Sequence, residues 1–378
     1  MSELHKKFIK KIKDREKQVG LPTLEENSDK INLDDNNDDD HNEIIKYEYE
    51  KIRNHTKATK AFIFPIEETY TDSRTGISFK TYYSPPISPG GAVLVCHHGA
   101  GSSAMTFCKL AKEVSDRSSK KIGLFTFDAR GHGDSSMTNP VDYTLKALTE
   151  DFKFILETFY EKQVQRPLIY LVGHSLGGSV VTNYLVECPD TSCDVVGLIS
   201  LDIVEETAID ALSHMLSFVR MRPHNFATYN DAIKWSLKKT SLLYNEDSAK
   251  ISIPDLLRET PKGLVWKTDL KPMAPFWDEW FKGFSSNFIN CGKRGHVSKL
   301  LVLSKHESLD TPLIVGQMQG KYQLIVFNQN HVGHFVQEDV PAQLSISFTD
   351  FVEKNNSPQE YIKNTLKITP KWGGPLYK

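Results

Sequence analysis

Residues 171–178 read Leu-Val-Gly-His-Ser-Leu-Gly-Gly and hold a Gly-x-Ser-x-Gly motif centred on Ser175. An apolar run before the motif predicts a buried strand, and the residues after it predict a helix. A serine at such a sharp turn has strained backbone, and its hydroxyl lies at a helix N-terminus that favours negative charge. Gly173 and Gly177 fit this interpretation, because side chains there would collide with neighbouring backbone. The motif therefore predicts that Ser175 is a nucleophile.

A serine hydroxyl is a weak nucleophile and needs a base, an acid that orients the base, and donors for the oxyanion. Where such a turn carries the serine, the acid and then the histidine follow it in the chain. Two histidines follow the last expected strand, His331 and His334. We favour His334 as the base, because Gly333 before it allows a tight loop that presents the ring.

Two aspartates compete for the role of the acid. Asp202 directly follows an expected strand at residues 195–201, and Asp310 lies in the loop after a strand at residues 300–303. Both positions fall at the carboxyl edge of the expected sheet, so the residues alone do not choose between them. The aspartate that is not the acid would serve as an ordinary loop cap or hydrogen-bond partner.

The oxyanion needs two backbone N–H groups. One is expected from Leu176, the residue directly after the nucleophile. The other is expected from the glycine-rich loop His-His-Gly-Ala-Gly-Ser-Ser at residues 97–103, with Ala100 as the favoured donor and Gly101 as its neighbour. Leu176 and Ala100 are therefore the predicted oxyanion hole.

Two further polar segments are assigned to structural roles. His97 and His98 are adjacent, so they point in different directions, and no carboxylate partner is nearby, which argues against a metal site. Residues 128–135 read Asp-Ala-Arg-Gly-His-Gly-Asp-Ser, and we expect their polar side chains to hold loops together. The chemistry outlined above needs neither a metal nor another cofactor.

The elements that must position these residues follow from the apolar pattern. Apolar runs predict strands at residues 61–65, 77–83, 92–96, 122–127, 168–172, 195–201, 300–303 and 322–327. After the third run, short apolar runs alternate with helical stretches, which is typical of a mostly parallel central sheet flanked by helices.

The stretch between residues 201 and 300 is too long for one crossover connection. We therefore expect an inserted helical cap at about residues 204–298, above the carboxyl edge of the sheet. The cap is rich in aromatic residues, most of them expected in its core. The run Phe-Trp-Asp-Glu-Trp-Phe at residues 276–281 is dense enough that part of it is expected to line a binding groove.

Composition bounds the class of protein. The chain has 378 residues and a formal net charge of −2, which argues against electrostatic binding of nucleic acid. Five scattered cysteines do not form a disulfide framework and predict reduced thiols, hence a cytoplasmic or nuclear location. No stretch approaches 18 apolar residues, so no membrane span is expected. Residues 1–46, basic and then acidic, are expected to be mostly disordered, and the folded body is expected at residues 47–378.

Several longer strings resemble one family, the eukaryotic protein phosphatase methylesterases. The most specific strings are Asp-Ile-Val-Glu-Glu-Thr-Ala at residues 202–208 and Gly-Gln-Met-Gln-Gly-Lys at residues 316–321. Others include Phe-Val-Arg-Met-Arg-Pro at 218–223, Ala-Ile-Lys-Trp-Ser at 232–236, and Gly-His-Phe-Val-Gln-Glu-Asp at 333–339. The similarity runs from about residue 60 to Gly373 and Gly374.

The resemblance implies an α/β-hydrolase fold and removal of the methyl ester from the C-terminal leucine of the type 2A protein phosphatase catalytic subunit. Carried over by motif, the nucleophile is Ser175, the base is His334 and the acid is Asp202 rather than Asp310. Methionine is common in the family where this chain has Leu176, which contributes only its backbone N–H. The resemblance implies no cofactor, and a phosphatase tail rather than nucleic acid or a membrane as the partner.

A peptide-tail substrate needs an extended groove. We expect the cap to supply it, with Arg220, Arg222, Trp277 and Trp280 contacting the tail or the phosphatase surface. Two other functions share these residues. One is a general carboxylesterase for small or lipid esters, which would use the same triad. The other is a protein that binds and inhibits the phosphatase without catalysis.

Overall fold

The computed structural model describes residues 38–240, 242–292, 297–304 and 309–356. The basic N-terminal segment, the first part of the acidic run, Gly373 and Gly374 lie outside these ranges. The first described element is helix α2 (Asp38–Ile63), which spans the expected start of the folded body near residue 47.

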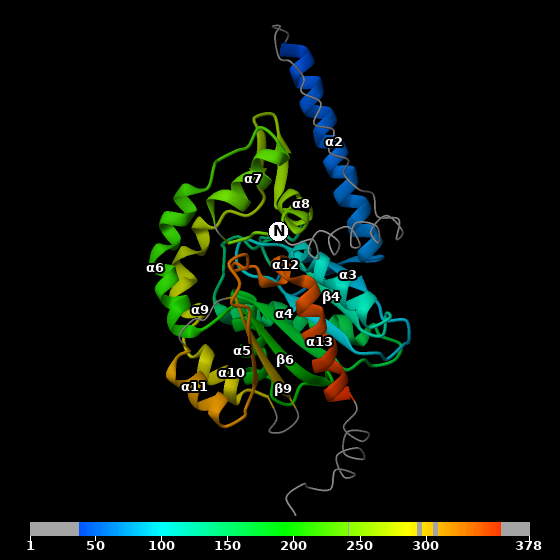
Figure 1. Cartoon of the computed structure of the whole chain (residues 1–378), viewed down its shortest axis with the longest axis vertical. Helices are drawn as coiled ribbons and strands as arrows, with labels where there is room; N and C mark the ends of the chain where they lie inside the picture. Colours follow the sequence, from blue (N-terminus) through cyan, green and yellow to red (C-terminus); the bar gives the residue numbers. More distant parts are fainter. Residues whose placement is uncertain (1–37, 241, 293–296, 305–308, 357–378) are drawn as a thin grey trace, which may run out of the picture.

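An eight-stranded sheet forms the centre of the molecule (Figure 1). Its order is β1-β2-β4-β3-β5-β6-β9-β10; β2 is antiparallel to both its neighbours, and all pairs from β4 to β10 are parallel. The predicted mostly parallel sheet is confirmed. The strands are β1 (Ile66–Thr71), β2 (Ser78–Ser84), β3 (Val93–His97), β4 (Gly123–Phe127), β5 (Ile169–His174), β6 (Val195–Leu201), β9 (Ser298–Leu303) and β10 (Gln323–Val326).

The first expected strand, at residues 61–65, is wrong. Residues up to Ile63 are the last turn of α2, and β1 begins at Ile66. Ile63 and Phe64 are buried in the same apolar cluster as residues of β3 and β4. They are apolar because they lie in the core, which is also why a buried strand is apolar. A short apolar run cannot distinguish the buried end of a helix from a buried strand.

Helices cover both faces of the sheet, and this explains why β3 is apolar at every position before His97. Val93 and Val95 pack in the cluster that includes α4 (Leu145–Glu161) and α5 (Leu176–Glu187). Leu94 and Cys96 pack in the opposite cluster, with α3 (Cys108–Arg117) and α13 (Pro341–Asn356). A parallel strand buried on both faces needs an apolar residue at every position, not at alternate ones.

Between the adjacent strands β6 and β9 the chain leaves the sheet for residues 202–297, which we call the insertion. It contains α6 (Glu205–Met221), α7 (Tyr229–Lys239), α8 (Glu246–Asp255), β7 (Leu257–Thr260), β8 (Gly263–Trp266), η2 (Lys271–Phe276), α9 (Trp277–Trp280) and α10 (Phe284–Asn290). The helices agree with the expected helical insertion, whereas the β7–β8 hairpin was not expected.

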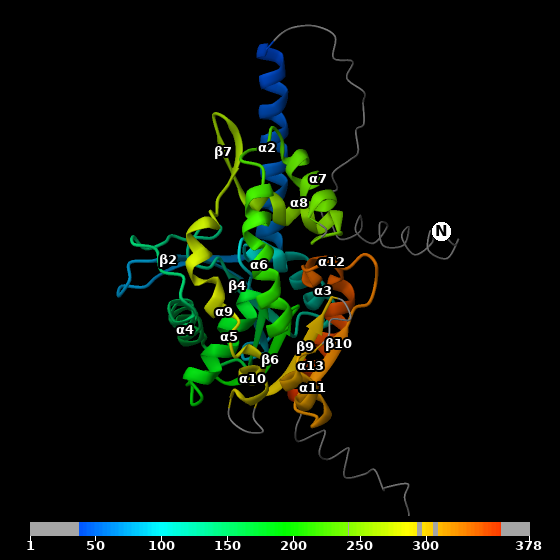
Figure 2. The same ribbon diagram turned by 90° about the vertical axis from the view of Figure 1, so that its left-hand side faces the viewer.

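Helix α2 packs against the insertion and projects beyond the rest of the molecule (Figures 1 and 2). Its Ile52 lies in an apolar cluster with residues of α7, α8 and the hairpin. The rings of Tyr49 and Tyr229 are 5.3 Å apart, and Lys60 Nζ donates to Asp255 Oδ1 at 3.1 Å. The helix before the sheet therefore helps to hold the insertion.

Three short helices complete the described chain: η1 (Ala104–Phe107), α11 (Thr311–Met318) and α12 (Val336–Asp339). All five cysteines are free thiols. None of the helices in the described ranges has the length and apolar character needed to span a bilayer.

Candidate active site

The predicted site residues meet at the carboxyl edge of the parallel strands. Ser175 follows β5, Asp202 follows β6, Ala100 lies in the loop after β3, and His334 lies in the loop after β10. Parallel neighbours end at the same edge, so loops distant in sequence come together there. All four residues line one cavity of about 470 Å³.

The turn that carries Ser175 is as sharp as its motif predicts. Ser175 has φ 51° and ψ −121°, a left-handed conformation that is costly for a residue with a side chain. A Cβ on Gly177 would lie 2.2 Å from the carbonyl oxygen of His97, and one on Gly173 would lie 2.4 Å from the carbonyl oxygen of Gly177. Glycine is therefore required at Gly173 for the turn to close, and at Gly177 for the turn to lie against the end of β3.

His334 and Asp202 are joined by a 2.7 Å hydrogen bond from Nδ1 to Oδ2, and the Ser304 N–H donates to Oδ1 at 2.6 Å. Burial raises the pKa of Asp202, but its interactions with His334 and Ser304 outweigh burial and hold that pKa below its ordinary value. An ionised Asp202 accepts the Nδ1 proton, so the lone pair of His334 is on Nε2.

The competing residues lie elsewhere. Asp310 is the N-cap of α11, where it accepts from the Leu313 N–H at 3.2 Å and from the Ser285 hydroxyl. His331 is exposed, with its ring 6.5 Å from that of Tyr244. Neither residue is among those that line the cavity. The geometry thus favours Asp202 and His334 where the residues alone left a choice.

The predicted oxyanion donors, Leu176 and Ala100, both line the cavity. The neighbouring candidate Gly101 donates its N–H to His132 Nε2 at 3.0 Å, so that group is already used. Within the described ranges, no acceptor takes the N–H of Leu176 or Ala100. Both N–H groups are therefore available to an acceptor bound in this cavity.

Neutral histidines hold this loop in place. His98 donates from Nδ1 to the Gly99 carbonyl at 2.8 Å and accepts at Nε2 from the Ala129 N–H at 3.0 Å. Burial lowers the pKa of His98 and of His132 to about 3, so both are uncharged at neutral pH. Among the described residues, no three potential metal-ligating side chains form a group that could hold a metal ion.

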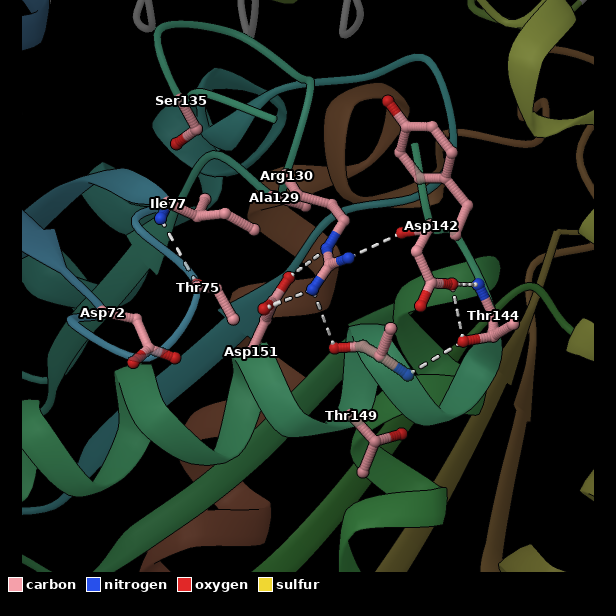
Figure 3. A network of polar contacts seen from close by, with 12 residues as sticks. Asp72, Thr75, Ile77, Ala129, Arg130, Ser135, Asp142, Thr144, Thr149 and Asp151 are labelled. Carbon is pink, nitrogen blue, oxygen red and sulfur yellow. Dashed lines mark hydrogen bonds and ion pairs between the residues drawn. The ribbon is translucent and has the colours of Figure 1, made fainter. Parts of the chain in front are cut away.

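The loop at residues 128–135 has the structural role expected of it. In Figure 3, Arg130 donates two hydrogen bonds to the carboxylate of Asp151 in α4, from Nε at 2.5 Å and from Nη2 at 2.6 Å. Its Nη1 donates a third to the Asp142 carbonyl at 2.6 Å. Asp128 in turn accepts the Ala104 N–H at 2.8 Å. These bonds fix the loops around the cavity, and neither Arg130 nor Asp128 lines it.

The insertion supplies the apolar wall of the cavity. Trp277 and Trp280 both line it, and both are buried, with Trp280 Nε1 donating to the Tyr143 carbonyl at 2.8 Å. Arg222 lines it as well, with its guanidinium 4.0 Å from the centre of the Trp266 ring. Arg220 is the exception, because it lines a neighbouring cavity instead.

The histidine loop is also bonded directly to the insertion, which sequence reasoning missed. Asp339 Oδ2 accepts the Gly333 N–H at 2.7 Å, and Oδ1 accepts the N–H groups of Tyr244 and Asn245 at 2.7 and 2.8 Å. Asp339 thus joins the residue before His334 to the segment before α8. The only available signal was the acidic pair Glu-Asp that ends the string 333–339.

Its neighbour Glu338 is buried between η1 and α8. Its Oε1 accepts from the Thr106 hydroxyl and its Oε2 from the Ser252 hydroxyl, both at 2.6 Å. Burial raises the pKa of Glu338 to about 8, although both hydrogen bonds lower it. A buried carboxyl with two neutral partners is therefore partly protonated near neutral pH.

We expect the substitution Glu338→Gln to change the melting temperature more favourably at pH 8 than at pH 5. A carboxyl with a raised folded pKa binds more protons when folded, so its contribution to stability falls as pH rises from about 4.5 to about 8. An amide has no such dependence. Thermal unfolding at both pH values tests this, with Glu353→Gln on the exposed face of α13 as the control. The same difference from wild type at both pH values would contradict it.

Comparison with known proteins agrees with this geometry. The model of the "Alpha/beta hydrolase family" matches residues 93–345. Proteins named protein phosphatase methylesterase 1 are 53% identical in Debaryomyces hansenii and 43% identical in Candida albicans, in each case over the whole of both chains. The Saccharomyces cerevisiae protein of that name is 39% identical over 76% of this chain and 74% of its own.

Solved structures share the fold. The hydrolase of E-2-(acetamidomethylene)succinate superposes with a TM-score of 0.60 and 18% identity, over 76% of this chain and 99% of its own. At that identity the likeness shows the fold alone. The matches over the full sequence go further, and they establish that this chain belongs to the protein phosphatase methylesterases, which are carboxylic ester hydrolases of the α/β-hydrolase fold.

Proposed function

We propose that this protein is a serine esterase that hydrolyses the methyl ester on the C-terminal leucine of the type 2A protein phosphatase catalytic subunit. The observation that carries the proposal is the grouping of Ser175 with the bonded pair His334 and Asp202 in one cavity. The substrate is the one implied by the family of the full-length relatives.

In the first half of the reaction, Ser175 Oγ attacks the carbonyl carbon of the ester while His334 Nε2 takes the hydroxyl proton. The N–H groups of Leu176 and Ala100 stabilise the oxyanion of the tetrahedral intermediate. Ionised Asp202 stabilises the imidazolium. His334 then returns its proton to the leaving oxygen, methanol departs, and the leucine carbonyl remains as an ester of Ser175.

In the second half, water replaces the methanol. His334 takes a proton from the water, whose oxygen attacks the acyl carbon, and the same two N–H groups stabilise the second oxyanion. Collapse of this intermediate returns the proton to Ser175 Oγ and frees the leucine carboxylate. Each step uses groups of this chain and one water molecule, so the reaction requires no cofactor.

The insertion is proposed to act as the cap that receives the phosphatase tail. Its tryptophans Trp277, Trp280 and Trp266 form an apolar wall next to Ser175, which suits an apolar C-terminal side chain. We place the protein in the cytoplasm or nucleus, a location supported by five free thiols and by the phosphatase partner.

Methanol release from the methylated phosphatase catalytic subunit tests this function. Wild-type protein is expected to release one methanol for each methylated tail. A panel of short-chain and long-chain esters is assayed in parallel. Rapid hydrolysis of small esters without demethylation of the phosphatase would instead identify a general carboxylesterase.

The hydrogen bonds that Asp339 accepts from Gly333, Tyr244 and Asn245, which we call the Asp339 clamp, lead to a further prediction. We expect Asp339→Asn to lower kcat for ester hydrolysis by about tenfold while KM changes little. An amide can accept the Gly333 N–H, but its NH2 group then opposes the N–H groups of Tyr244 and Asn245. The loop with His334 would lose one anchor without any change in the groove.

Steady-state kinetics measure this effect, and Asp350→Asn on the exposed face of α13 is the matched control. Circular dichroism at the assay temperature checks that both variants are folded. A rise in KM at unchanged kcat would assign Asp339 to substrate binding and contradict the proposed positioning role.

A further inference from the structure

A second cavity of about 500 Å³ adjoins the one that contains Ser175. Both cavities are lined by Arg222, Trp266 and Leu270, which therefore lie where the two cavities meet. The second cavity is strongly basic: four cationic side chains line it, Arg220, Arg222, Arg258 and Lys271, against one carboxylate, Asp269. We call it the cationic cavity.

Arg222 is the residue that connects the two spaces. Burial lowers the pKa of its guanidinium to about 10, and only Asp269 acts in the opposite direction. In the described part of the chain, no carboxylate lies within 4.0 Å of Arg222, and no group accepts a hydrogen bond from it. The Trp266 ring, 4.0 Å away, compensates part of the lost hydration through a cation–π contact.

Arg222 is half-buried, and a cation that is withdrawn from water without a counter-ion is unfavourable, a cost that an anionic ligand lowers. Arg220, Arg258 and Lys271 around the same cavity are exposed and have no ion-pair partner among the described residues. Basic groups that are left unpaired around a hollow attract and orient an acidic ligand. Guanidinium groups moreover bind carboxylates through two parallel hydrogen bonds.

We propose that the cationic cavity binds acidic side chains of the substrate protein that lie a few residues before its methylated C-terminus. This inference rests on the proposed function, because it requires a chain that enters the first cavity with its ester end. An extended chain advances about 3.3 Å per residue, so the residues just upstream of the ester reach a neighbouring cavity. The cavity would thus set the preference for the sequence of the tail.

Two hexapeptides with C-terminal leucine methyl esters provide the test. They are identical except that one carries two aspartates upstream of the leucine and the other carries two asparagines. We expect wild-type protein to show a KM about tenfold lower for the acidic peptide. Because exposed charges contribute, this preference should shrink as salt rises from about 0.05 to 0.5 M.

The variants identify the cavity as the cause. Arg258 and Lys271 line only the cationic cavity, so the double substitution Arg258→Glu with Lys271→Glu is expected to abolish or reverse the preference. The double substitution Lys238→Glu with Lys239→Glu makes the same charge change at exposed positions of α7 that line neither cavity, and it should keep the preference. Hydrolysis of p-nitrophenyl acetate reports whether each variant is folded and active.

Two results would overturn the inference while leaving the proposed function intact. One is equal KM values for the two peptides with wild-type protein, and the other is an unchanged preference in the double variant. If p-nitrophenyl acetate is hydrolysed but neither the peptides nor methylated phosphatase release methanol, the proposed function fails, and this inference fails with it.

Discussion

Ser175→Ala is expected to lower kcat for demethylation by about 10⁶-fold, the largest effect of any single substitution in this protein. The methyl side chain cannot form the acyl-enzyme, and the remaining groups cannot substitute for it because they act as a unit with the serine. Binding of methylated phosphatase should persist, since the groove is unchanged. Methanol release and a direct binding measurement on the same variant separate the two effects.

The matched control is Ser179→Ala, which removes a hydroxyl one helical turn later in α5. The Ser179 hydroxyl is buried and has no hydrogen-bond partner, and alanine is favourable in a helix. This control should keep full activity. Demethylation by Ser175→Ala at more than about one per cent of the wild-type rate would show that another residue is the nucleophile.

Asp202→Asn is expected to lower kcat by about 10⁴-fold with little change in the fold. Asp202 accepts both the Nδ1 proton of His334 and the N–H of Ser304, whereas an amide can accept only one of them and presents its NH2 to the other. If the amide donates to Nδ1, the proton of His334 moves to Nε2, and the base is lost. Steady-state kinetics with a small ester measure the effect free of partner binding.

Asp310→Asn is the control, and it decides between the two aspartates that the sequence left open. Asp310 caps α11, and an asparagine caps a helix N-terminus about as well as an aspartate. We therefore expect near wild-type kcat and a small change in melting temperature. Loss of activity in Asp310→Asn together with a functional Asp202→Asn would reverse the assignment of the acid.

The nucleophile could be predicted from the sequence because its turn is encoded locally. Gly173, Ser175 and Gly177 lie within five residues, and at Gly173 the constraint that selects glycine is a clash across the turn itself. The sheet could also be predicted, because a strand buried on both faces needs an uninterrupted apolar run, as in β3 and β5. Both patterns can be recognised in a single sequence without an alignment.

The acid could not be chosen in this way, because Asp202 and Asp310 both follow strands of the correct edge. What separates them is spatial: β6 is the direct neighbour of β5, which carries Ser175, whereas Asp310 lies beyond β9 and caps a helix. Helix α2 was not predicted from the sequence for a related reason. Helix α2 is stabilised by contacts with the distant Tyr229 and Asp255, which no local pattern reveals.

Asp339 accepts hydrogen bonds from Gly333, Tyr244 and Asn245. Through these bonds the insertion helps to hold the loop that carries His334. These bonds order the histidine loop when the chain folds. The loop therefore loses its conformational entropy at that stage and not again in each turnover. Local opening of the insertion would release that loop even where the sheet stays intact. We therefore expect heat to inactivate the protein when the least stable part joined by Asp339 opens, at a temperature where the central sheet is still folded.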